Sequence, residues 1–169
     1  HTGVCPGPLA LTHPDLVVDS VTAPATAYSG TGVTVTWTVR NAGTGPTAAG
    51  WTDRVYLSSD AAYSSGDVLL GSYARAAALA AGESYAAAAS LDVTLPNGID
   101  GNWYVIVVAD AANGVTERGA AENNNAGASA AVSVALAPYA DLAVSNVKVL
   151  SNGADAPLYA DLENPAVLT

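Results

Sequence analysis

The feature that most constrains the fold is a strict alternation of apolar and polar residues between Val33 and Arg40. Val33, Val35, Trp37 and Val39 share one parity, and threonines and Arg40 occupy the other. Because successive side chains of a strand point to opposite faces, this pattern predicts a strand with one buried face.

Similar short segments recur along the chain, separated by clusters of Gly, Pro, Asn and Asp. Further strands are expected at residues 15–21, 50–58, 67–74, 83–95, 101–110 and 128–136. About seven short strands with a turn every 8–12 residues are typical of an all-β, immunoglobulin-like antiparallel β-sandwich. Helix is the rival interpretation of the Ala-rich stretches 74–81 and 86–89, since alanine favours helices. These stretches are short and keep the strand parity, so we predict strands there.

The predicted core is built on aromatic and branched residues at the inward parity. The core is expected to contain Trp37, Trp51, Trp103 and Tyr104 together with the Val and Leu set, with partial exposure of Trp51, at a strand start, as the alternative. An exposed set of tryptophans could instead form a platform for sugars. Val68 and Leu70 are expected to point inward.

One carboxylate, Asp53, shares the parity of Trp51 and Val55 in the 50–58 strand. It is expected either to pair with an arginine, such as Arg54, or to accept hydrogen bonds from loop amides.

Composition narrows the function. The formal net charge is −10 with only 12% charged residues, so the surface repels nucleic acid. The longest strongly apolar run, residues 103–109, is too short for membrane insertion, which takes about 20 residues in a helix.

The two histidines and the one cysteine all lie within the first 13 residues. Residues 14–169 therefore cannot form Ser-His-Asp, Cys-His or His/Cys zinc sites, and we predict that the chain is not an enzyme. Composition does not exclude a glycosidase carboxylate pair, but no cleft elements favour one.

The chain divides into three parts by pattern. Residues 1–13 are predicted to be a tail or linker, 14–137 a sandwich domain, and 138–169 a linker and the incomplete start of a next repeat. The motif DLVVDSV at 15–21 recurs as DLAVSNV at 141–147, each preceded by a proline. This echo predicts a tandem array, although a chance match of a common strand motif would look the same.

Several segments together resemble the CARDB family, the cell-adhesion-related domain found in bacteria. The segments are PDLVV (14–18), VTVTWTVRNAG (33–43), WTDRVYLSSD (51–60), GDVLLG (66–71), LAAGESY (79–85), GNWYVIVVAD (101–110), NGVTE (113–117) and ENNN (122–125). The resemblance covers about residues 14–137 and implies an immunoglobulin-like sandwich, usually repeated in large bacterial surface or secreted proteins. The family usually places a second Glu three residues after the first in the last loop, whereas here Glu117 and Glu122 are five apart.

Oxygen-bearing side chains gather in two predicted loops. Hard cations take roughly six to eight such oxygens, often from flexible loops. The sequence therefore allows a calcium site. The spacing does not fit an EF-hand, and the same residue types are what turns require. The candidate calcium ligands are Asp60, Asp67, Asp110, Asn113, Glu117 and Glu122.

These observations predict a non-catalytic spacer or adhesion module of a larger tandem-repeat protein. Its expected partners are neighbouring modules of the same chain, and cell-surface polysaccharide or protein. The acidic, lysine-poor composition fits an extracellular or bacterial cell-surface location. The alternative is a carbohydrate- or protein-binding accessory module of a secreted hydrolase.

Overall fold

The computed structural model describes residues 11–48, 50–85, 90–138, 148–151 and 154–157. The chain divides into two compact units, His1–Ala137 and Pro138–Thr169. In the second unit, β11 (Lys148–Ser151) and β12 (Ala154–Pro157) form an antiparallel hairpin. The echo motif at 141–147 lies outside the described residues. No helix in the described part of the chain is long and apolar enough to cross a membrane.

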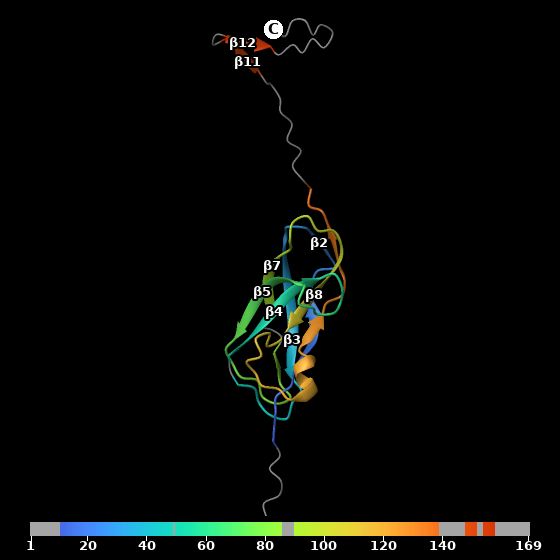
Figure 1. Ribbon diagram of the computed structural model, residues 1–169, viewed down its shortest axis with the longest axis vertical. Coiled ribbons are helices and arrows are strands. Elements are labelled where there is room, and N and C mark those ends of the chain that lie inside the picture. Colours follow the sequence, from blue (N-terminus) through green and yellow to red (C-terminus); the bar gives the residue numbers. More distant parts are fainter. Residues whose placement is uncertain (1–10, 49, 86–89, 139–147, 152–153, 158–169) are drawn as a thin grey trace, which may run out of the picture. The chain divides into compact units, whose positions relative to one another are not determined.

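The first unit is a sandwich of two sheets, which confirms the all-β, immunoglobulin-like prediction (Figure 1). In the smaller sheet β3 is central and pairs antiparallel with its three neighbours. Its strands are β1 (Leu16–Thr22), β3 (Gly32–Asn41), β6 (Ser84–Tyr85) and β7 (Ser90–Thr94). In the larger sheet the order is β2-β10-β8-β4-β5, and β9 also pairs with β8. Its strands are β2 (Thr26–Tyr28), β4 (Trp51–Ser58), β5 (Val68–Arg75), β8 (Gly101–Val108), β9 (Ala126–Ala128) and β10 (Val132–Ala135).

Most strands lie where the alternation predicts them, with differences at the edges. The short β2 was not expected, and it pairs parallel with β10. The stretch 83–95 contains two short strands, β6 and β7, and residues 86–89 between them are outside the described residues. Of the Ala-rich stretch 74–81, the first two residues belong to β5 and the rest is irregular, so neither helix nor strand is correct for 76–81.

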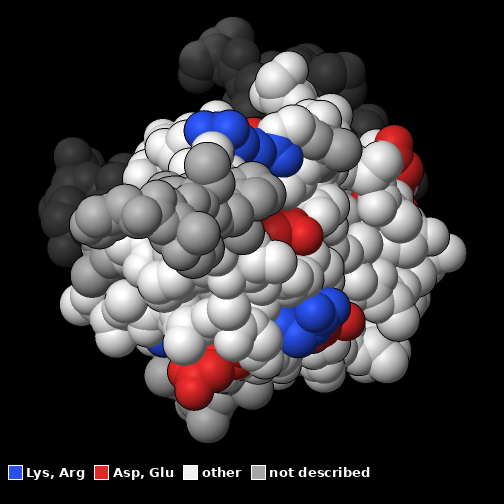
Figure 2. All heavy atoms as spheres, turned by 90° about the horizontal axis from the view of Figure 1, so that it is seen from below, with Lys and Arg blue, Asp and Glu red and all other residues white. Residues whose placement is uncertain are grey.

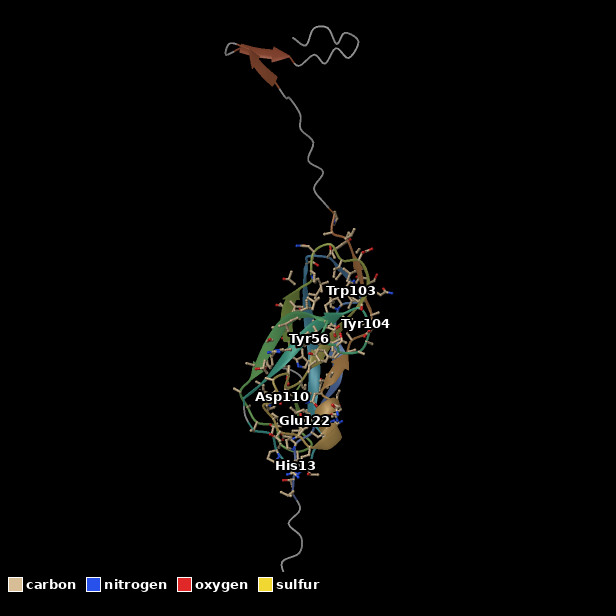
Figure 3. All side chains as sticks on the ribbon, in the orientation of Figure 1. His13, Tyr56, Trp103, Tyr104, Asp110 and Glu122 are labelled. Atoms are coloured by element: carbon tan, nitrogen blue, oxygen red, sulfur yellow. The ribbon has the colours of Figure 1, made fainter. Side chains whose placement is uncertain are left out.

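One tryptophan departs from its predicted burial. Trp37 is 2% exposed and Trp51 is 3% exposed, so both belong to the core as expected, and the alternative of a partly exposed Trp51 is wrong. Trp103 is half-buried rather than buried, since its indole lies at one end of the sandwich and donates a hydrogen bond to the Asp100 carbonyl at 3.0 Å (Figure 3).

Strand β5 shows a second departure. The register of the β4–β5 pairing shifts between Val55, which pairs with Gly71, and Tyr56, which pairs with Leu69, so Leu70 is the extra residue of a bulge. Leu70 packs partly against the core, as predicted. Val68 pairs with the core residue Leu57 but is 46% exposed, contrary to the prediction, and β5 lies at the edge of the larger sheet.

The buried Asp53 carboxylate connects the two sheets. The indole nitrogens of Trp37 and Trp51 each donate to it at 3.1 Å, and the Asp110 amide donates at 3.2 Å. The Tyr85 hydroxyl also donates to it. Burial raises the pKa of Asp53, and these hydrogen bonds lower it in part. Of the two predicted roles, acceptance of a loop amide is the one observed. We call Asp53 and its four donors the Asp53 cluster.

Arg75 covers this cluster from β5. Its guanidinium carbon lies 4.1 Å from the centroid of the Tyr85 ring and 5.2 Å from that of Trp51. A cation over aromatic faces is attracted to their ring quadrupoles.

Candidate functional site

The long connection between β8 and β9, residues 110–125, carries most of the candidate ligands, and we call it the acidic loop. It begins with a tight turn held by Asp110, which is 2% exposed. The Asp110 carboxylate accepts hydrogen bonds from the amides of Gly114 at 2.9 Å and Val115 at 2.6 Å. Asp110 and Asn113 both have positive φ, 45° and 53°, a conformation that Asp and Asn tolerate better than most residues. Asp110 is thus largely occupied in shaping this turn.

Farther along, the acidic loop folds Glu122 back toward Glu117. The 3₁₀ turn Gly119–Asn123 lies between them, and the Glu117 amide donates to Glu122 Oε1 at 2.7 Å. The turn therefore accommodates the five-residue spacing that distinguishes this chain from the usual family pattern. The Glu122 carboxylate is thus held against the Glu117 backbone, and its negative charge acts on the Glu117 carboxylate.

The Glu117 carboxylate is held from the opposite side by β1. Its Oε1 accepts a hydrogen bond from the Leu16 amide. Burial raises the pKa of Glu117, the Leu16 amide lowers it, and the charge of Glu122 raises it further. A second bond joins the same segments, because Asn124 Nδ2 donates to Asp15 Oδ1 at 2.9 Å. The acidic loop thus fastens the start of β1.

Close packing brings β9 against β1 beside these bonds. A Cβ atom on Gly127 would lie 2.6 Å from Val18 Cγ1. Only glycine allows this approach, so the position of the loop end relative to β1 is fixed by backbone contact.

Three oxygens in this region are buried without a hydrogen-bond partner. They are Glu117 Oε2, Glu122 Oε2 and Asn125 Oδ1. Glu117 is 4% exposed and Asn125 is 7% exposed, so water at the surface does not reach most of these side chains. An unsatisfied buried polar group costs about 1–3 kcal/mol, so three in one place mark an incomplete site.

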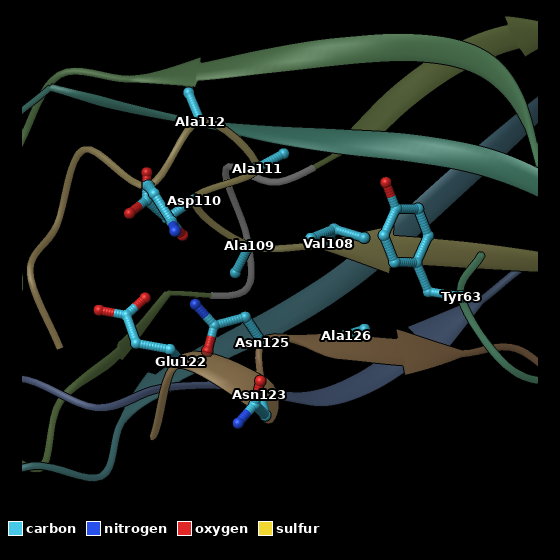
Figure 4. A pocket seen from close by; sticks show the side chains of 11 residues that line it. Tyr63, Val108, Ala109, Asp110, Ala111, Ala112, Glu122, Asn123, Asn125 and Ala126 are labelled. Atoms are coloured by element: carbon cyan, nitrogen blue, oxygen red, sulfur yellow. The ribbon is translucent and has the colours of Figure 1, made fainter. Parts of the chain in front are cut away.

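A pocket of about 540 Å³ opens beside the acidic loop (Figure 4). The side chains of Asp110, Glu122, Asn123 and Asn125 lie toward one end, and the Tyr63 ring lies toward the other. Asn113 also lines the pocket. Apolar residues complete the lining: Val108, Ala109, Ala111, Ala112 and Ala126. Three of the six predicted ligands, Asp110, Asn113 and Glu122, therefore face one pocket, and Glu117 contacts Glu122.

The other two predicted ligands, Asp60 and Asp67, belong to a different loop and do not line this pocket. Asp60 Oδ1 accepts the Ala62 amide at 2.8 Å, and Asp67 accepts the Ser64 amide at 2.8 Å. Burial raises the pKa of Asp67, but hydrogen bonds from Ser64 and Ser58 bring it below its ordinary value. Both carboxylates act here as turn acceptors.

The side chains beside the acidic loop determine which metal ions this region could hold. Within the described ranges, no three His, Cys, Asp or Glu side chains form a group that could hold a metal ion. The unpartnered set of two carboxylates and one amide contains only oxygen donors, which suit hard cations such as calcium. Asn125 was not among the predicted ligands, and its burial in a loop of otherwise turn-forming residues was not visible in the sequence.

Charge at this end of the sandwich is sparse at the surface. Seen from the end where the chain enters, most of the surface is uncharged, and a blue and a red group lie against each other at the lower right (Figure 2). Both Asp110 and Glu122 lie toward this end, on the side of His13 (Figure 3). The acidic character of the region is therefore mostly buried, and it does not form an exposed acidic patch.

Comparison with known proteins identifies the family. The CARDB family model matches residues 13–129. No curated protein matched the chain. The crystal structure of the CARDB domain of PF1109 from Pyrococcus furiosus, in complex with di-metal ions, is 22% identical with a TM-score of 0.52, covering 75% of this chain and 95% of that one.

Two further solved structures also match the chain. The solution structure of the same Pyrococcus furiosus domain has a TM-score of 0.51 at 22% identity and covers 75% of this chain and all of that one. A β-glucosidase from Listeria innocua is 17% identical with a TM-score of 0.43, and the match covers 73% of this chain and 16% of that chain. At these identities the likeness to solved structures shows the fold alone, and the match over residues 13–129 establishes that the chain belongs to the CARDB family.

Proposed function

We propose that the chain is a non-catalytic spacer and adhesion module of a larger tandem-repeat bacterial surface or secreted protein. The observation that carries the proposal is the path of the chain through the sandwich. It enters at one end, near residue 11, and leaves at the opposite end, near Ala137 (Figure 1).

Hydrogen bonds fix both ends of this path. At entry, the Ala42 amide donates to the Asp15 carbonyl at 2.6 Å, beside the end of β3. At exit, the Ala137 amide donates to Ser29 Oγ at 3.3 Å, just before β3 begins. The ten residues of β3 therefore separate entry from exit, and at about 3.3 Å per residue each module would extend an array by roughly 33 Å.

The echo of the first-strand motif at 141–147 supports a following module of the same kind. The described part of the chain offers one histidine, His13, and no cysteine, so the proposal assigns no reaction to the module. The net charge of −10 and the low lysine content support an extracellular location and argue against nucleic-acid partners.

Small-angle scattering of parent-chain fragments that contain one, two and three modules tests the spacer role. The maximum dimension should grow by about 30–40 Å with each module, as expected for end-to-end stacking. A dimension that barely grows, or a parent reading frame without a further copy, would contradict the proposal.

The pocket beside the acidic loop favours a second candidate, a carbohydrate-binding accessory module. Tyr63 is 46% exposed and shares the pocket with the amides of Asn113, Asn123 and Asn125. Aromatic faces and amide groups are what sugars contact in proteins. A glycan array of the intact chain separates the candidates: binding that is lost in Tyr63→Ala supports the second, and no signal above background supports the spacer.

A further inference from the structure

Buried anionic oxygens without partners occur in one place among the described residues. Glu117 Oε2 and Glu122 Oε2 each have no hydrogen-bond partner, and neither carboxylate forms an ion pair in the described part of the chain, where the one ion pair joins Arg40 to Asp19. Two neighbouring carboxylates in a poorly solvated site repel each other strongly. The arrangement therefore favours a positively charged occupant over an anion or a neutral ligand.

The third unpartnered oxygen belongs to Asn125, whose side chain interacts with the Glu117 carboxylate. A half-turn of an amide exchanges its oxygen and nitrogen. The Asn125 side chain can therefore serve the carboxylates as a donor when the site is free and as an oxygen ligand when a cation is bound. Glu122 and Asn125 both line the pocket, which provides an entry path and room for the waters that complete the coordination of a hard cation.

We propose that Glu117, Glu122 and Asn125 bind one divalent cation, calcium or magnesium, and that this cation stiffens the attachment of β1 to the acidic loop. The mechanical link is direct. Glu117 Oε2 faces the cation while Oε1 of the same carboxylate accepts the Leu16 amide. Asn124, the neighbour of Asn125, binds Asp15. The site thus lies where the chain enters the sandwich, and it stands independently of the spacer role.

This assignment is narrower than the six ligands expected from the sequence. Asp110, Asp60 and Asp67 each accept amide hydrogen bonds within their own turns. Asn113 lines the pocket as an exposed residue of left-handed backbone. The assigned set retains Glu117 and Glu122 and adds Asn125.

The test is a thermal melt of the 169-residue chain after chelator dialysis, followed by addition of calcium or magnesium to about 5 mM at neutral pH. A site with a dissociation constant near 10⁻⁴ M should raise the midpoint by a few degrees. Calorimetric titration should show one site per chain. The Leu16 amide should exchange its hydrogen more slowly when the cation is present.

Glu122→Gln should weaken cation binding at least about tenfold. The variant should remain folded, because the glutamine side-chain oxygen can still accept the hydrogen bond from the Glu117 backbone N–H. The matched control, Asp60→Asn, removes a carboxylate of the other loop and should respond to the cation like the unaltered chain. Terbium, a luminescent substitute for calcium, gives a second readout through Tyr63, which lines the same pocket. Its signal should be lost in Glu122→Gln and kept in Asp60→Asn.

Three outcomes would overturn the proposal. The first is no heat and no shift of the midpoint with either cation. The second is an equal response in Glu122→Gln. The third is stabilisation by mild acid without any by cations, which would mean that the two carboxylates share a proton instead.

Discussion

The described part of the sandwich contains two regions of buried carboxylate, and they differ in how many hydrogen-bond donors their oxygens receive. In the Asp53 cluster, four donors from both sheets converge on one carboxylate. In the acidic loop, Glu117 and Glu122 lie beside each other with one oxygen of each left without a partner.

The difference separates a structural role from a ligand-binding one. A carboxylate whose acceptor sites are all used holds the fold together and has nothing to offer a ligand. Carboxylates with unused, buried acceptor sites lower the stability of the free protein, and a bound cation would offset this loss. The Asp53 cluster should therefore respond to mutation by loss of stability, and the acidic loop by loss of cation response.

The largest expected effect is at Trp37, which supplies both core volume and one donor to Asp53. Trp37→Ala should lower the free energy of unfolding by about 4–5 kcal/mol, measured by chemical denaturation. Trp103→Ala, on a half-buried side chain at one end of the sandwich, serves as the matched control and should cost about 1–2 kcal/mol. Equal losses would mean that the two indoles contribute alike and that the cluster adds nothing.

Asp53→Asn should cost about 2–4 kcal/mol, because one face of the new amide would place hydrogens against the indole and phenol donors. The same substitution at Asp60, whose carboxylate is exposed and accepts only a turn amide, should change stability by less than about 0.5 kcal/mol. Urea denaturation of both variants makes the comparison. A loss at Asp53 below about 1 kcal/mol would show that the four hydrogen bonds contribute little net stability.

These two predictions rest on residues that the sequence revealed unequally. The alternation at 33–39 predicted β3 and the burial of Trp37, because one strand with one buried face determines its own pattern. The parity of Asp53 showed that it points inward, but its donors come from β3, β6 and the acidic loop, and no local pattern reports such distant partners. The indole of Trp51 is also held inside the sandwich by Asp53, because it donates a hydrogen bond to that carboxylate.

The acidic loop was predictable in composition and not in geometry. Glu117 and Glu122 were expected as ligands, but the 3₁₀ turn that folds one back to the other follows from local backbone preferences too weak to read in the sequence. Asn125 lies in the same oxygen-rich loop but was not among the predicted ligands, and no local pattern reports that it is buried. Asp60 and Asp67 resemble ligands by type, and only their amide contacts distinguish them.

A pH series sharpens the account of Asp53. Its folded-state pKa is raised mainly by burial, so the folded chain holds a proton that the unfolded chain has lost just above the ordinary Asp value of about 3.9. Its contribution to stability is therefore complete below that value and falls as the pH rises through the folded-state pKa. The difference in unfolding free energy between the unaltered chain and Asp53→Asn should be larger at about pH 4 than at neutral pH. Glu117 titrates in both proteins and cancels in this difference, and a difference that grows with pH would contradict the predicted sign.

The smallest effect is expected from removing most of the second unit. Residues Pro138–Thr169 form a compact unit of their own, so deletion of 141–169 should leave the melting midpoint of the sandwich within about 2 °C. Differential scanning calorimetry of both chains makes the measurement. A fall of more than about 8 °C would mean that this segment completes the sandwich.

The most direct test of the central claim compares charge removal in the two regions under chelator. Asp53→Asn and Glu122→Gln each replace a carboxylate by its amide, and the thermal midpoints of both variants are measured against the unaltered chain. The midpoint should fall in Asp53→Asn, since donors lose their acceptor. It should rise in Glu122→Gln, since repulsion with Glu117 disappears and the new amide can donate to Glu117 Oε2. A fall of similar size in both would contradict the account, because it would show that the acidic loop, like the Asp53 cluster, is already complete without a cation.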